Sequence, residues 1–130
     1  MLNNIPNPVK RERLRRGIEL GMDSPDFVGA VMRYEKLLDD MESALENGPW
    51  LLGDEFSLAD ISFASYMARL QHLGFGERIE ARPRTAEWTG RLMAQPSYKE
   101  GIEEWFDPKY LDLFDRQREA AKEKIKEITG

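Results

Sequence analysis

The pattern of apolar positions is most regular between residues 27 and 45. Apolar side chains recur there at alternating spacings of four and three residues, at Phe27, Val31, Tyr34, Leu38, Met41 and Leu45. This spacing places all of them on one face of an α-helix, so that face is predicted to pack in a core. Ser24-Pro25 supplies the start signal, a capping side chain before a proline at the first helical position, and Asn47-Gly48-Pro49 supplies the stop.

Five further segments carry the same kinds of helix signals. Each begins at a capping side chain or just before a proline. We predict helices at 8–20, 58–73 and 83–94, a short helix capped by Ser97, and a last helix that starts at Asp107-Pro108. The short connection at Met22-Asp23 predicts that the first two helices lie antiparallel. No run alternates β-branched and polar residues between turns, so the sequence predicts an all-α fold, a bundle of about six helices.

The segment from Phe56 to Ile61 predicts how the helix at 58–73 begins. The Ser57 side chain can accept a hydrogen bond from the backbone N–H three residues on, while the Asp60 carboxylate accepts one from the N–H of Ser57. Phe56 and Ile61 flank this capping box and are placed to close over it as a hydrophobic staple. The helix is apolar almost all round, which predicts that it is buried. Because a buried helix start has no water for its free N–H groups, this box is expected to matter more than one on a surface helix.

Two blocks of residues, in order, resemble one protein family. The first runs from Trp50 through Gly53 to Asp60, and the second combines Arg82-Pro83-Arg84 and Trp88 with Gln95-Pro96-Ser97-Tyr98-Lys99. Together they resemble the C-terminal domain of the glutathione transferases, in which the first block is the entry to the central helix. The resemblance covers about residues 49 to 102. It implies a glutathione transferase C-terminal-like helical bundle over residues 7–130, with residues 1–6 as the remnant of an interdomain linker.

The resemblance implies a role in a two-domain enzyme. Full-length members begin with a thioredoxin-like domain that binds glutathione, the co-substrate, and activates its thiol. Nothing in this sequence matches that domain, so the chain alone is expected to be inactive, with no catalytic residue and no cofactor of its own. In the family, the helical domain forms the wall of the pocket for a hydrophobic, electrophilic acceptor and part of the interface of a homodimer. By that layout the first helix and the segment after Trp105 line the pocket, and Arg13, Arg16 and Tyr66 are the expected substrate-binding residues.

A second hypothesis belongs to another class of protein. Domains that resemble the glutathione transferase C-terminal domain also act as stand-alone interaction modules, in translation factor and aminoacyl-tRNA synthetase assemblies. Such a module would present an exposed apolar patch to a protein partner, whereas the first hypothesis requires a pocket for a small molecule. The two hypotheses therefore differ in which kind of surface the fold should present.

Composition narrows the classes of function. The 130 residues are enough for one core, and they contain no cysteine, which removes thiolate nucleophiles, cysteine-ligated zinc and disulfides. The net charge of −5 disfavours binding to nucleic acid, because affinity for phosphates comes from accumulated lysine and arginine. No apolar run is long enough for a membrane span, and no secretory leader is encoded. We therefore expect a cytoplasmic protein that binds neither nucleic acid nor a membrane.

Charged residues gather in two clusters. Five basic residues lie between Lys10 and Arg16, and four acidic residues lie between Asp39 and Glu46. Each cluster is most simply a solvated helix face. The basic cluster could also attract an anionic ligand, and in a homodimer it could pair with the acidic cluster of the second copy.

Individual residues favour structural roles over chemistry. His72 is the only histidine, with no second ligand at metal-binding spacing, so no metal site is predicted and the imidazole is expected to lie near the end of its helix. Arg69, on the same helix, is expected to pair with Glu42 or Asp39. Trp105 is most simply a core aromatic, like Tyr34 and Trp88, although an edge-exposed aromatic could stack on an aromatic substrate.

Overall fold

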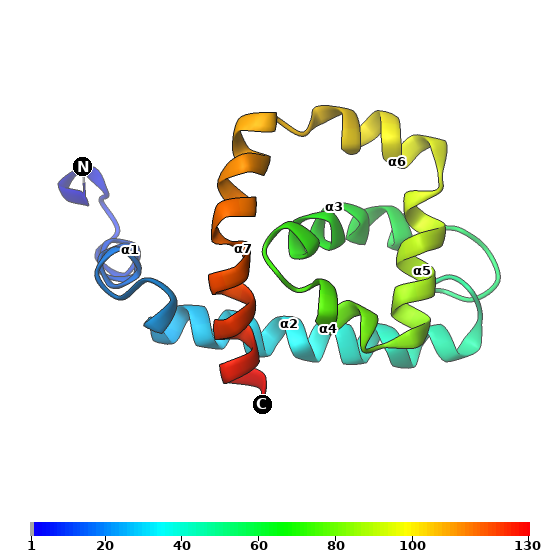
Figure 1. The fold of residues 1–130 in the computed structure, drawn as a ribbon, viewed down its shortest axis with the longest axis horizontal. Coiled ribbons are helices and arrows are strands. Elements are labelled where there is room, and N and C mark those ends of the chain that lie inside the picture. Colours follow the sequence, from blue (N-terminus) through cyan, green and yellow to red (C-terminus); the bar gives the residue numbers. More distant parts are fainter. Residues whose placement is uncertain (1) are drawn as a thin grey trace.

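The structure is a bundle of α-helices. The computed structural model describes residues 2–130, and within that range it contains seven α-helices and no strand, so the all-α prediction is confirmed. Figure 1 shows the helices wrapped around α3, with α2 along one side and α7 across the end of the bundle. Their bounds are α1 (Pro8–Leu20), α2 (Pro25–Ala44), α3 (Leu58–His72), α4 (Gly76–Glu80), α5 (Pro83–Met93), α6 (Pro96–Gly101) and α7 (Pro108–Thr129).

Most helices begin where the sequence predicts. Asn7, Ser24, Ser57 and Asp107 each cap a helix with the side chain. Two predictions are wrong. The five-residue α4 was not predicted, because it begins at Gly76, two residues after Gly74, and its start has no side-chain cap. Ser97 does not cap α6 either: that helix starts at Pro96, and Ser97 lies inside it.

The core forms where the apolar face of α2 meets α3, α5 and α7. Of the six apolar residues spaced from Phe27 to Leu45, four are buried, and the other two, Phe27 and Tyr34, are half-buried against them. Trp88 of α5 is fully buried, and Ile125 brings α7 into the same cluster. Trp105 is not a core residue, contrary to the simpler prediction, because 79% of it is exposed.

Ion pairs join α2 to the turn between α4 and α5. Glu35 of α2 is buried and accepts hydrogen bonds from Arg78 at 2.9 and 2.7 Å and from Arg82 at 2.9 Å. Arg82 also pairs with Asp39, while Glu42 accepts from the backbone N–H and the hydroxyl of Thr85, each at 2.8 Å. The hydrogen bond from Arg78 lowers the pKa of Glu35 and outweighs the opposite effect of burial. These contacts join α2 to α4 and to the start of α5.

Helix α1 lies outside the core. It has no buried residue, and three of its apolar side chains, Val9, Ile18 and Leu20, are largely exposed. Figure 1 shows α1 almost end-on at the edge of the bundle while α2 runs across the view, so the predicted antiparallel packing of α1 and α2 is wrong. The helix turns away because Gly21 ends it with a φ of 54°, and a 3₁₀ turn, Gly21–Asp23, follows.

Helix α3 is only half-buried, although its sequence predicted a helix enclosed on all sides. Its inner face carries Ala64, Met67, Ala68 and Leu70, all buried. Leu58, Ile61 and Tyr66 lie on the outer face, where each is more than half exposed. The outer face of the central helix therefore keeps several apolar side chains exposed.

Candidate functional site

The start of α3 is organised by one buried carboxylate. Asp60 is fully buried, and its Oδ1 accepts from the N–H of Leu51 at 3.0 Å and from the indole Nε1 of Trp88 at 2.7 Å. Its Oδ2 accepts from the N–H of Ser57 at 2.9 Å and from the Ser57 hydroxyl at 3.3 Å. The Ser57 hydroxyl in turn accepts from the N–H of Ala59, so the predicted capping box is confirmed. The bond to Trp88, which sequence spacing did not predict, joins this box to α5.

The predicted staple residues contribute to a different contact. Phe56 packs edge-on against Trp50, with ring centroids 4.9 Å apart. Phe56 and Ile61 both line a small depression against Tyr98 and Ile102, the first two from the start of α3 and the others from the end of α6. Closure of Phe56 over Ile61 therefore stays a prediction, while the shared depression places both residues beside α6.

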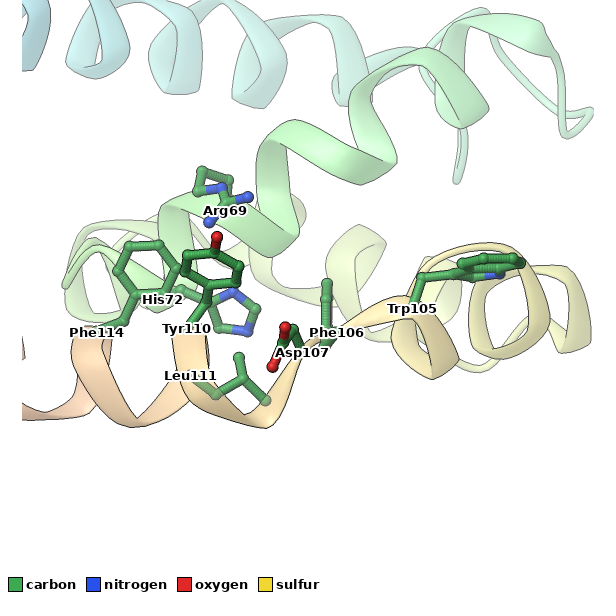
Figure 2. Close-up of a pocket in the computed structure, with 8 residues that line it drawn as sticks. All are labelled: Arg69, His72, Trp105, Phe106, Asp107, Tyr110, Leu111 and Phe114. Atoms are coloured by element: carbon green, nitrogen blue, oxygen red, sulfur yellow. The ribbon is translucent and has the colours of Figure 1, made fainter.

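A larger cavity lies where the end of α3 meets the start of α7. Figure 2 shows the eight residues that line this cavity of about 410 Å³. Arg69 and His72 come from α3, and the others come from the segment between η4 (Glu103–Trp105) and the first two turns of α7: Trp105, Phe106, Asp107, Tyr110, Leu111 and Phe114. Four of the eight side chains are those of Phe, Tyr or Trp residues. The walls are therefore suited to a flat apolar ligand.

His72 lies among the aromatic rings of this cavity. Its ring packs edge-on against Phe106, with centroids 4.7 Å apart, and parallel to Phe114 at 6.2 Å. Burial lowers the pKa of His72, and the positive charges of Arg69 and Arg118 lower it further, while Asp115 acts in the opposite direction. The imidazole is therefore neutral at pH 7, because burial and the nearby positive charges both disfavour its charged form.

Arg69 faces the cavity without an acidic partner. Its guanidinium lies 5.0 Å from the centre of the Phe114 ring, a cation–π contact. The predicted pairing with Glu42 or Asp39 is wrong, because Glu42 is bound to Thr85 and Asp39 to Arg82. Within residues 2–130 no carboxylate forms an ion pair with Arg69, whereas the neighbouring Arg118 pairs with Asp115.

The three predicted substrate-binding residues do not share one cavity. Arg13 and Arg16 both pair with Asp26, at 3.9 and 3.0 Å. Arg13 also lines a shallow depression between α1 and α2 that includes Arg33. Tyr66 is 53% exposed on the outer face of α3, beside the ring of Phe63. Their role in binding substrate stays a prediction. Arg69, one turn from Tyr66, does line the cavity, although the sequence predicted only a structural role for it.

An apolar groove adjoins the cavity. It measures about 660 Å³ and lies between the first half of α2, the end of α3 and the middle of α7. Phe114 lines both spaces, and the groove includes Tyr34, Phe75 and Leu113. Only Gln117 gives the groove a polar side chain apart from the hydroxyl of Tyr34, so it is a surface for apolar contact.

Two further classes of site, a metal centre and a membrane-spanning helix, are absent from residues 2–130. No group of three or more histidine, cysteine or acidic residues is arranged to hold a metal ion there. In the same range, no helix combines the length and the apolar character needed to cross a bilayer.

Comparison with known proteins identifies the family. The family model for the glutathione S-transferase C-terminal domain matches residues 11–91, from α1 into α5. A 2,5-dichlorohydroquinone reductive dechlorinase of Sphingobium indicum is 35% identical over 89 residues, 65% of this chain and 26% of that protein. Glutathione S-transferase TCHQD of Arabidopsis thaliana is 38% identical over 84 residues, 61% of this chain and 32% of that protein. A glutathione S-transferase of Hyoscyamus muticus is 34% identical over 86 residues, 65% of this chain and 41% of that protein.

The matches have a limited extent. The chain spans less than half the length of each of these relatives, and no solved structure matches it. The matched range ends before α6 and α7, so the α7 side of the cavity lies outside it. The match still covers more than half of the chain, and its range includes Ser57 and Asp60 of the capping box. This chain belongs to the glutathione S-transferase C-terminal domain family.

Proposed function

We propose that this domain forms the acceptor-binding wall of a glutathione transferase-like enzyme. Glutathione is the co-substrate in this proposal, and a thioredoxin-like domain activates its thiol. The helical domain holds a hydrophobic, electrophilic acceptor beside that thiol, so its contribution to rate is orientation and exclusion of water. The observation that carries the proposal is the aromatic cavity at the junction of α3 and α7, whose opening and size suit a small aromatic molecule.

The names of relatives support an aromatic acceptor. Two relatives are named for the reductive removal of halogen from hydroquinones: the Sphingobium indicum dechlorinase and a tetrachloro-p-hydroquinone reductive dehalogenase of Sphingobium chlorophenolicum. A flat halogenated ring would be matched by the ring faces of Phe106 and Tyr110. We therefore propose an aromatic electrophile as the acceptor class.

The test joins this chain to the thioredoxin-like domain of a full-length glutathione transferase. The chain alone is expected to leave the conjugation of glutathione to 1-chloro-2,4-dinitrobenzene at the buffer rate, and the fusion is expected to raise it. In the fusion, Leu111→Ala should change the ratio of kcat/KM between small and bulky aromatic acceptors, because Leu111 lines the cavity. The matched control is Leu113→Ala, since Leu113 lines only the neighbouring groove. Equal selectivity for both variants and the parent would contradict the proposal, as would turnover by the chain alone.

We also propose that the domain self-associates through α1. Val9 and Ile18 are 76% and 68% exposed, and an exposed apolar stripe on a helix tends to find a partner. The acidic cluster of α2 is the weaker part of the proposed interface, because Asp39, Asp40 and Glu46 already pair with Arg82, Lys36 and Arg84 of the same chain.

A cytoplasmic location remains a prediction of the sequence.

Sedimentation equilibrium tests this association. A dimer is expected that Ile18→Asp converts to monomer, while the exposed Met32→Asp on α2 leaves it unchanged. Any part that exposed charges contribute should weaken once salt brings the screening length below about 8 Å. A monomer at all concentrations would favour a domain that docks another protein instead.

A further inference from the structure

The charges around the cavity are unevenly placed. Arg69 and Asp107 are its only charged lining residues at pH 7, because His72 is neutral there. Asp107 caps α7 and accepts from the N–H of Lys109 at 2.9 Å, so its charge is directed at the start of its own helix. In the view of Figure 2, Asp107 lies on the other side of the His72 ring from Arg69. The end of the cavity beside Arg69 therefore has a positive potential.

The guanidinium is held ready for a ligand. Phe114 supports one face of the Arg69 group at 5.0 Å, and this contact leaves the N–H edges without an acidic acceptor in the described chain. A planar guanidinium presents paired donors that match two oxygens of an anion. In Figure 2 the hydroxyl of Tyr110 points toward the same end of the cavity, which adds a neutral polar group there.

The remaining lining is apolar and flat. Phe106 and Leu111 are half-buried and Phe114 closes the α7 side, so the middle of the cavity offers ring faces and hydrocarbon. A ligand that satisfies both parts must have a flat apolar body and a negative group at one end. We propose that the acceptor bound here is an aromatic electrophile that carries a negative group, such as a halogen- and nitro-substituted aromatic carboxylate, with its charge on Arg69 and its ring against Phe106 and Tyr110. This inference rests on the proposed function, since it specifies the ligand of the same cavity.

Two probes that share a skeleton test the inference on this chain. 1-Anilinonaphthalene-8-sulfonate carries a negative sulfonate, and N-phenyl-1-naphthylamine has the same rings without it. Their dissociation constants are measured by fluorescence titration for the parent and for Arg69→Gln. Arg33→Gln is the matched control, because Arg33 is an exposed arginine that lines the separate depression on α2.

The expected result separates charge from shape. Arg69→Gln should weaken the sulfonate probe about tenfold or more, the loss of one charge-assisted hydrogen bond, and leave the neutral probe within about twofold. Arg69→Lys should restore only part of the sulfonate affinity, because its ammonium keeps the charge and lacks the paired donors, and Arg33→Gln should change neither probe. Urea midpoints for Arg69→Gln within experimental error of the parent would show that the fold is intact, as expected for an exposed side chain.

Other outcomes overturn the inference in distinguishable ways. Equal weakening of both probes by Arg69→Gln, or no weakening of either, would show that Arg69 does not select an anion. Loss of sulfonate binding in Leu113→Gln would place the probe in the neighbouring groove, and would also overturn it. In each of these cases the proposed function stands if Phe106→Leu weakens the neutral probe. If Phe106→Leu alters neither probe, the cavity binds no aromatic ligand, and the proposed function fails together with the inference.

Discussion

Helices α1 and α3 begin with similar capping hydrogen bonds, but they differ in how much of each helix is buried. At α1, the Asn7 side chain accepts from the N–H groups of Val9 and Lys10, at 2.9 and 3.1 Å. At α3, Ser57 and Asp60 satisfy the first-turn N–H groups in the same way. Asp60, however, is fully buried and reaches Trp88, while α1 buries nothing. Capping therefore decides where a helix begins, and tertiary contact decides how much the helix contributes to the stability of the fold.

The largest expected effect comes from removing the carboxylate of Asp60. Asp60→Ala should lower the free energy of unfolding by about 3 to 4 kcal/mol, because the Trp88 indole and two backbone N–H groups lose their acceptor inside the core. Asp60→Asn should recover little, since its amide would direct a donor at other donors. Urea denaturation measures both. Asp40→Ala, which removes only an exposed pair with Lys36, should stay within about 0.5 kcal/mol, and equal losses at the two positions would contradict this account.

The second expected effect compares two ion pairs. Glu35→Gln should destabilise by about 2 kcal/mol, because two guanidinium groups, of which Arg82 is largely buried, lose their shared charge partner. Glu19→Gln on α1 removes a short pair with Arg15 that is exposed on both sides, and should change stability by less than about 0.5 kcal/mol. Equal shifts of the urea midpoint for the exposed and the buried pair would contradict this expectation.

The contribution of Glu35 to stability should also depend on pH. It is fully present above the pKa of Glu35 in the unfolded chain, and it should be lost as the pH falls through the lowered pKa of the folded chain.

The third expected effect is confined to α1. Asn7→Ala removes the cap and should cost that helix about 1 kcal/mol, yet leave the global urea midpoint in place because α1 contributes no buried residue. Amide hydrogen exchange resolves the difference: α1 amides should exchange faster than those of α2 in the parent, and faster still in the variant. Slow exchange in α1 would mean that it is covered in solution, as it would be in the proposed dimer, and dilution should then speed it.

The smallest expected effect concerns His72. Its pKa is lowered in the folded chain, so the unfolded chain binds the proton more readily and stability should fall as the pH drops below the ordinary histidine pKa. His72→Gln should flatten this part of the pH profile of the urea midpoint, while the loss of ring contacts with Phe106 and Phe114 lowers the midpoint by the same amount at every pH. An unchanged profile would show that the imidazole is as easily charged in the folded chain as in the unfolded one.

The sequence predicted most of the helical starts because those signals are local. A proline after a capping side chain acts through the residues next to it, as at Ser24-Pro25 and Asp107-Pro108, and both predictions are confirmed. The capping box of Ser57 and Asp60 was found for the same reason. The short α4 was not predicted because it lacks a capping side chain and is held by contacts of Ile79 and Arg78 with other helices.

The cavity could not be predicted from local signals. Arg69 and Phe114 are far apart in the chain, and neither residue type indicates the other, so their contact depends on how α7 crosses the end of α3. The same dependence explains the error at Trp105, whose indole lies on the surface and donates to the carbonyl of Glu100. The bond between Asp60 and Trp88 was missed likewise, although each residue was recognised separately.

The crossing of α7 over the end of α3 makes the cavity depend on the position of one helix. Gly74, with a φ of 97°, lets the chain after α3 approach α7 so closely that a Cβ there would meet the Arg118 carbonyl oxygen at 3.3 Å. Arg69 and His72 of α3 line one side of the cavity, and the segment from Trp105 to Phe114 supplies the rest of its lining. A movement of α7 away from α3 would therefore take the cavity apart. A ligand that contacts both helices would favour the docked position of α7, because binding to one state shifts the equilibrium toward that state.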